Sequence, residues 1–208
     1  MAWTKKNLCL LCVKSTACSC KPVPKSFSTF FLTEATVADL EAHARQTFGI
    51  KDIQYGRFKR IAEDVNKGLA FARGRGFRMP TGVQIGAGKG IRMAGLYSVS
   101  NDAMWFNGLL PGLSGRRPML VSDHPCAIVI HEFGHMLHSD KVGGRYDNLK
   151  NHQFRGDTEK EIIATVSKYA ASNGLEFVAE VFSGMVCDHR QFSDIVMRQY
   201  RILDGPDV

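Results

Sequence analysis

The most informative stretch of the chain is Ala127-Ile-Val-Ile-His131-Glu132-Phe-Gly-His135-Met-Leu-His138, in which a glutamate follows the first of two histidines spaced four residues apart. On an α-helix such residues share one face, with Cβ atoms about 5–6 Å apart, so both imidazoles can meet one metal ion. Glu132 then lies where a carboxylate can take a proton from a zinc-activated water. This spacing predicts a zinc enzyme that hydrolyses peptide bonds.

The residues around the motif predict that its helix is buried. Ala127-Ile-Val-Ile130 precedes the motif, and Phe133, Met136 and Leu137 continue the apolar character on nearly every side. Two satisfied core histidines are the alternative interpretation. A buried helix ordinarily avoids two imidazoles and a carboxylate unless they are compensated, however, and this favours the metal site.

A catalytic zinc needs a third protein ligand, and two residues compete for this role. His138 follows His131 by seven residues, so it lies roughly 10 Å along the helix axis and cannot share an ion bound at about 2.1 Å. We therefore expect His138 to be an outer partner of the site or a packing residue. The extended motif with a third histidine six residues after the second fails, because that position is Lys141.

Glu176 is the better third ligand. It lies with Glu180, four residues later, on a second predicted helix whose apolar face includes Phe177 and Val181. The alternative is a capping box, in which Asn173 caps the helix and Glu176 reaches back to a backbone N–H. Capping does not explain the second glutamate one turn later on a largely apolar helix.

Two segments together resemble a known family. His131-Glu-Phe-Gly-His135, followed by a tyrosine seven residues before the glutamate of Glu176-Phe-Val-Ala-Glu180, is similar to the zincin metallopeptidases typified by the protease domain of anthrax lethal factor. The run from Ser167 to Glu180 looks closer still to zincin-like domains encoded in bacteriophage structural-gene regions, often in or beside minor head proteins. The resemblance covers roughly residues 36–190, but its specific motifs occupy only these two short segments.

The resemblance implies roles for three residues: Glu176 as third zinc ligand, Tyr169 as hydrogen-bond donor to the developing oxyanion, and Glu180 as an outer partner of the site. Tyr169 also makes chemical sense alone, because a phenol with a pKa near 10 stays protonated at neutral pH and one such donor can contribute about 3 kcal/mol. The alternative is an ordinary aromatic residue at the end of the preceding helix.

The chain divides into a basic arm, residues 1–30, and a metallopeptidase domain, residues 31–208. The arm holds five lysines and no acidic residue, so it carries five of the seven net positive charges. It also holds Cys9, Cys12, Cys18 and Cys20, which could close a structural metal site, although an oxidised framework or an unstructured thiol-rich arm are alternatives. At 208 residues and 44% hydrophobic, the chain can bury a core without disulfides.

No apolar run reaches the 18 residues of a membrane span, and the apolar stretch of the arm, residues 8–13, is short for a secretory signal. We therefore expect the protein in the cytoplasm of the host cell of a phage or prophage, or on the virion. Its expected partners are a protein or peptide substrate, phage structural proteins, and nucleic acid through the basic arm. Two rival functions stay open: a DNA-associated protease whose arm grips nucleic acid, and a non-catalytic virion or interaction protein with a structural zinc.

The predicted fold is α+β and zincin-like, with a small twisted mixed sheet packed on the active-site helix and a C-terminal helix supplying the third ligand. Helices are expected from Thr36 to Gly49 and over residues 57–72, and strands over 81–85, 95–99 and 103–107. Because the strand with Trp105, Phe106 and Asn107 is the last before the site, we expect it to be a free edge that binds substrate. The alternative is that Trp105 is simply a core residue. Residues 108–120 and 139–157 are expected as loops, and the first could form a lid over the cleft; the alternative is that both are only connections.

Overall fold

The computed structural model describes residues 35–87, 94–113 and 120–208. The N-terminal arm with its four cysteines, and residues 114–119 of the loop that was predicted as a lid, lie outside the described residues. Thr36–Val208 forms one compact unit. Its elements in chain order are α2 (Val37–Phe48), β1 (Asp52–Gln54), α3 (Lys59–Gly74), β2 (Gly82–Gly86), β3 (Gly95–Ser98), β4 (Ala103–Asn107), α4 (Ala127–Val142), the 3-10 helix η1 (Gly143–Asn151), α5 (Gly156–Thr165), the 3-10 helix η2 (Ala170–Ser172), α6 (Gly174–Asp188) and α7 (Asp194–Ile202).

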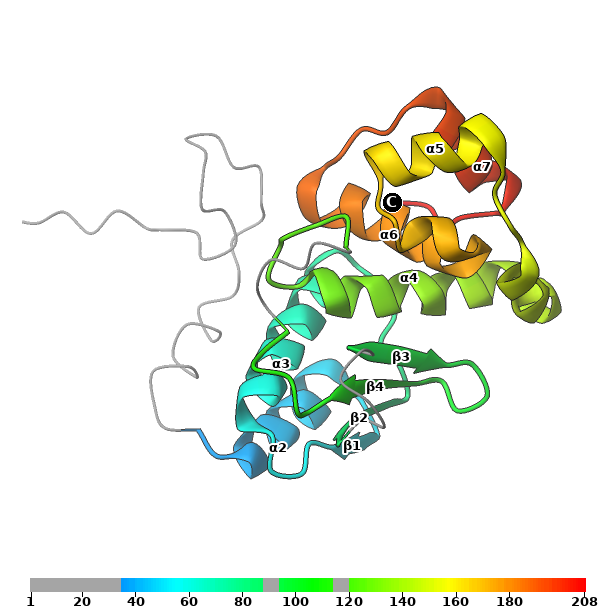
Figure 1. The fold of residues 1–208 in the computed structure, drawn as a ribbon. Helices are drawn as coiled ribbons and strands as arrows, with labels where there is room; N and C mark the ends of the chain where they lie inside the picture. Colours follow the sequence, from blue (N-terminus) through cyan, green and yellow to red (C-terminus); the bar gives the residue numbers. More distant parts are fainter. Residues whose placement is uncertain (1–34, 88–93, 114–119) are drawn as a thin grey trace, which may run out of the picture. The chain divides into compact units, whose positions relative to one another are not determined.

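The described part of the chain is a mixed α+β structure with six α-helices and one four-stranded mixed sheet. In Figure 1, α2 and α3 lie beside the sheet, while α4 runs between the sheet and the C-terminal helices α5, α6 and α7. The coarse α+β prediction is therefore confirmed. Among the described residues, no helix combines the length and hydropathy needed to cross a bilayer.

Helix α2 begins and ends as its sequence predicts. The Thr36 side chain accepts a hydrogen bond from the Asp39 backbone N–H, and the Asp39 carboxylate accepts one from the Thr36 backbone N–H. The helix ends at Gly49, whose φ of 71° is in the left-handed region that glycine adopts most easily. Leu40, Ala44 and Phe48 form its buried face.

The strand order of the sheet is β1-β2-β4-β3. Strands β1, β2 and β4 are parallel, and β3 pairs antiparallel with β4, with Gly95 opposite Phe106 and Tyr97 opposite Met104. The three predicted strands are present. Strand β1 was not predicted, because its three residues, of which only Ile53 is buried, are too few to show an alternation of apolar and polar side chains.

The prediction that the Trp105 strand is a free edge is wrong. Strand β4 lies inside the sheet, paired with β2 on one side and β3 on the other. The hairpin that joins β3 to β4 places β3 outermost, beside α4, as Figure 1 shows. The order of the strands in the sheet therefore differs from their order in the chain, because β4 lies between β2 and β3.

Helix α4 is the centre of the fold and is buried on nearly all sides, as predicted. It packs closely on α6 at Gly134, where an added Cβ would lie 2.9 Å from the Ala179 Cα. It packs equally closely on α3 at Gly68, where an added Cβ would meet the Val129 side chain at 2.5 Å. The glycine within the histidine motif thus lets the backbones of α4 and α6 approach each other.

Candidate metal centre

Two helices bring three potential metal ligands together. His131 and His135 project from α4, and their Nε2 atoms lie 3.1 Å apart. From α6, the Oε2 atom of Glu176 lies 3.1 Å from His131 Nε2 and 3.4 Å from His135 Nε2. Among the described residues, these three form the one group of His, Cys, Asp or Glu side chains that could hold a metal ion. The grouping predicted from the sequence is therefore confirmed.

The spacing of the three donor atoms fits a tetrahedral metal ion. Ligand atoms bonded at about 2.1 Å and arranged tetrahedrally are roughly 3.4 Å apart. The donor–donor distances here, 3.1, 3.1 and 3.4 Å, are close to that value. Two imidazoles and one carboxylate leave a further coordination position for a water or substrate, as in catalytic zinc sites. The cluster could therefore hold a metal ion.

Glu180 orients His131 from the side away from the cluster. Its Oε1 lies 2.8 Å from His131 Nδ1, and its Oε2 accepts hydrogen bonds from the Val121 backbone N–H at 2.7 Å and from the Ser167 hydroxyl at 2.9 Å. A carboxylate that accepts from Nδ1 leaves the Nε2 lone pair directed at the cluster. The outer role that the resemblance implies for Glu180 is consistent with this contact.

Opposing effects act on the pKa of His131. Burial alone would lower the pKa, but hydrogen bonds and the negative charges of Glu176 and Glu180 outweigh burial and raise it well above its ordinary value. The two carboxylates thus supply the negative charge that a bound cation would balance.

His135 has an outer partner that the sequence did not reveal. The Tyr146 hydroxyl lies 3.0 Å from His135 Nδ1, and both side chains are buried. Tyr146 belongs to η1, in the segment predicted as a loop between the ligands. No motif spacing marks it, and a tyrosine among polar residues was its only sequence signal.

The sequence left open whether Glu176 is a metal ligand or part of a capping box with Asn173. The Asn173 side chain caps α6 by accepting from the backbone N–H groups of Leu175 and Glu176. The Glu176 carboxylate faces the histidines instead. Burial would raise the pKa of Glu176, but hydrogen bonds with His131 and His135 outweigh burial and hold the pKa well below its usual range.

Glu132 is buried beside the cluster, 4% exposed, and its carboxylate packs against β3. An added Cβ on Gly95 would lie 2.5 Å from the Glu132 Oε1 atom, so only glycine leaves room for the carboxylate. The Oε2 atom has no hydrogen-bond partner within the described part of the chain. Burial raises the pKa of Glu132, and the neighbouring His135 and His131 offset this only in part.

Tyr169 lies immediately before η2, and its ring stacks on His131, with centroids 5.9 Å apart and planes at 27°. Burial and the negative charge of Glu176 raise the pKa of Tyr169, so its hydroxyl remains a hydrogen-bond donor at neutral pH. The structure thus brings Tyr169 to the cluster, while its role in catalysis stays a prediction.

His138 is not part of the cluster, as the sequence predicted. Its Nε2 lies 2.7 Å from the Leu203 backbone oxygen, and its ring packs edge-on against Tyr146 at 5.6 Å between centroids. Burial lowers the pKa of His138 to about 4, so the imidazole is neutral near pH 7. Its ring contacts Tyr146, whose hydroxyl in turn lies 3.0 Å from His135 Nδ1.

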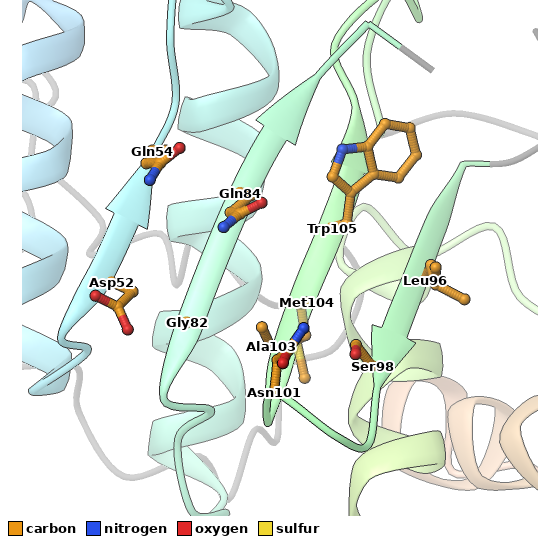
Figure 2. Close-up of a pocket in the computed structure, with 10 residues that line it drawn as sticks. All are labelled: Asp52, Gln54, Gly82, Gln84, Leu96, Ser98, Asn101, Ala103, Met104 and Trp105. Atoms are coloured by element: carbon orange, nitrogen blue, oxygen red, sulfur yellow. The ribbon is translucent and has the colours of Figure 1, made fainter. Parts of the chain in front are cut away.

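The predicted substrate residues Trp105, Phe106 and Asn107 do not line the cluster as a group. Phe106 and Asn107 are fully buried, so they cannot contact a peptide in this arrangement. Trp105 points to the opposite face of the sheet from Phe106, because side chains alternate along a strand. Figure 2 shows Trp105 with Gln54 and Gln84 on that face, over a depression of about 380 Å³.

Comparison of the chain with protein-family models, with curated proteins and with solved structures found no match.

Proposed function

We propose that the protein is a zinc-dependent peptidase of the zincin type. The observation that carries the proposal is the set of three donor atoms, His131 Nε2, His135 Nε2 and Glu176 Oε2, at mutual distances of 3.1 to 3.4 Å. The buried Glu132 carboxylate beside them supports a hydrolytic site in particular. Two histidines and a carboxylate are a ligand set of known zinc peptidases, and imidazole nitrogens suit Zn²⁺.

In this proposal Glu132 is the general base. A bound zinc ion lowers the pKa of a water molecule to about 7 and polarises a carbonyl group. Glu132 accepts the proton of the attacking water at Oε2, the carboxylate atom without a partner in the described residues, and later passes it to the leaving amine. A raised pKa suits both steps, because a base whose pKa lies closer to the working pH can accept and then release the proton.

Tyr169 is the electrophilic partner. Its phenol stays protonated because burial and Glu176 raise its pKa, so it can donate a hydrogen bond as negative charge develops on the substrate carbonyl oxygen. The stack on His131 fixes the ring beside the ligands. Loss of one such donor typically costs about 10²–10³ in turnover.

Strand β3 is the surface on which we place the substrate. It pairs with β4 on one side, and its other edge has no partner strand among the described residues. An extended peptide can add to such an edge through backbone hydrogen bonds. Gly95 on this strand touches Glu132, so a peptide bound there would lie next to the general base.

The rival of a purely structural zinc is less well supported. Structural zinc sites are closed by four protein ligands, whereas the cluster offers three among the residues that the structure describes. A structural site also gives no reason for the buried, unpartnered carboxylate oxygen of Glu132. The phage origin and a DNA-binding role of the arm rest on the sequence alone, and we keep them as hypotheses.

The test compares the full-length protein with Glu132→Gln, measuring bound zinc and cleavage of casein or of the chain itself. The amide cannot accept the water proton, so we expect unchanged zinc and a loss of about 10²–10⁴ in turnover. Equal turnover by the variant would exclude Glu132 as the base. Zinc without any cleavage by the parent protein would instead favour the non-catalytic rival.

A further inference from the structure

The second histidine of the motif is held from outside the cluster by one hydroxyl. His135 Nε2 faces His131 and Glu176, whereas its Nδ1 lies 3.0 Å from the Tyr146 hydroxyl. When Nε2 binds a metal ion, the neutral ring carries its hydrogen on Nδ1, and the Tyr146 oxygen accepts it. Tyr146 thus occupies toward His135 the position that Glu180 occupies toward His131.

Tyr146 is itself fixed between the two ligand helices. It packs in a small apolar cluster with Val142 at the end of α4, Leu149 of η1, and Leu175 of α6, which directly precedes the ligand Glu176. The His138 ring lies edge-on to it at 5.6 Å between centroids. With these contacts the Tyr146 ring has little freedom to move its hydroxyl away from His135.

His138 connects this arrangement to the C-terminal segment, Leu203–Pro206. Its Nε2 donates to the Leu203 backbone oxygen at 2.7 Å. The same segment is bound to α4 by Lys141, whose Nζ donates to the Gly205 oxygen at 2.8 Å. Arg145 of η1 pairs with Asp204 at 2.8 Å. The segment is therefore attached to α4 and η1, two of the three elements that contact Tyr146.

We propose that Tyr146 is a positioning residue for His135, and that the C-terminal segment holds Tyr146 in place through His138. The inference rests on the proposed zinc site and adds a residue that the histidine motif does not contain. Removal of the hydroxyl leaves the His135 Nδ1 hydrogen buried without an acceptor, and the ring is free to rotate or to place its hydrogen on Nε2. Either change weakens metal binding.

The experiment measures zinc affinity by competition with a chelator in the full-length protein. Every variant also carries Cys9→Ser, Cys12→Ser, Cys18→Ser and Cys20→Ser, so that metal bound by the arm does not contribute. We expect Tyr146→Phe to lower zinc affinity by roughly 10–100-fold, the usual effect of losing a hydrogen bond to a ligand. The matched control is Tyr55→Phe, which removes a buried hydroxyl that donates to Asn66 of α3 at 2.6 Å and not to a metal ligand, so it should leave affinity unchanged.

The visible spectrum of the cobalt-substituted protein reports the geometry of the bound metal. It would not change if Tyr146 only stabilised the fold. Tyr146→Phe should change the spectrum, whereas Tyr55→Phe should not. Wild-type zinc affinity together with a wild-type cobalt spectrum in folded Tyr146→Phe would overturn the inference. Absence of zinc binding by the parent protein would refute the proposed metal site itself, so the two failures are distinguishable.

His138→Asn tests the link to the C-terminal segment. Because this variant keeps the Tyr146 hydroxyl, it also tests the proposal if Tyr146→Phe does not fold. We expect it to lower zinc affinity in the parent protein and to have little further effect in the Tyr146→Phe background, because residues acting in series are not additive. Additive losses, or no loss from His138→Asn alone, would overturn the link.

Discussion

Replacement of Glu180 by glutamine changes one oxygen to an amide nitrogen and tests how the ligand His131 is held. The Glu180 carboxylate accepts three hydrogen bonds, from His131 Nδ1, the Val121 backbone N–H and the Ser167 hydroxyl. Glutamine keeps one oxygen. If that oxygen faces Val121 and Ser167, the amide N–H₂ opposes Nδ1, and the His131 hydrogen moves to Nε2, where it blocks the metal. If the oxygen faces His131, the amide opposes the buried Val121 N–H.

Both arrangements have a measurable cost. In the second arrangement the Val121 N–H is buried without an acceptor, which costs about 1–3 kcal/mol and should lower the free energy of unfolding by that amount. In the first arrangement the blocked Nε2 should lower zinc affinity by roughly 10–100-fold. Urea denaturation of the chelated protein and zinc competition measure the two effects, and Glu63→Gln on the partly exposed side of α3 is the control. Unchanged zinc affinity together with an unchanged free energy of unfolding in Glu180→Gln would refute the claim that Glu180 sets the His131 tautomer.

Three further substitutions test other contacts. Gly134→Ala should destabilise the protein by about 1–3 kcal/mol, because its Cβ would lie 2.9 Å from the Ala179 backbone, whereas Gly74→Ala, with open space around it, should be neutral or stabilising in a thermal melt. Gly95→Ala should keep zinc but lose about 10²-fold in turnover, since its Cβ displaces Glu132. His138 has its pKa lowered to about 4, so the unfolded chain binds more protons between about pH 6.5 and 4, and stability of the chelated protein falls as pH falls through that window. His138→Asn should reduce the change in the free energy of unfolding across this pH window by up to about 3 kcal/mol, as measured by urea titrations at several pH values. An unchanged dependence of the free energy of unfolding on pH would contradict this prediction.

Local patterns were sufficient to predict most of the elements and the ligand set. The capping box at Thr36 and Asp39 and the terminal Gly49 set the bounds of α2 through contacts within a few residues. His131, His135 and Glu176 were predictable because the chemistry of zinc restricts both ligand type and helical spacing. These are short-range constraints that one sequence can carry.

Long-range arrangement was not predictable in the same way. The sheet order placed β4 inside and β3 at the edge, which depends on pairings across the whole sheet and not on the order of strands in the chain. Tyr146 reaches His135 from η1, which directly follows α4, and it packs there with Leu175 of α6. No spacing rule connects a tyrosine to a histidine eleven residues earlier when the helix ends between them.

The most direct measurement of the central claim is a crystal structure of the full-length protein with zinc, recorded at the zinc absorption edge. We predict an anomalous peak from one zinc ion bonded to His131 Nε2, His135 Nε2 and Glu176 Oε2, each at about 2.0–2.2 Å, with Tyr169 and Glu132 facing the remaining coordination position. A protein that takes up zinc but shows no peak at these three residues, or a peak there closed by a fourth protein ligand, would contradict it.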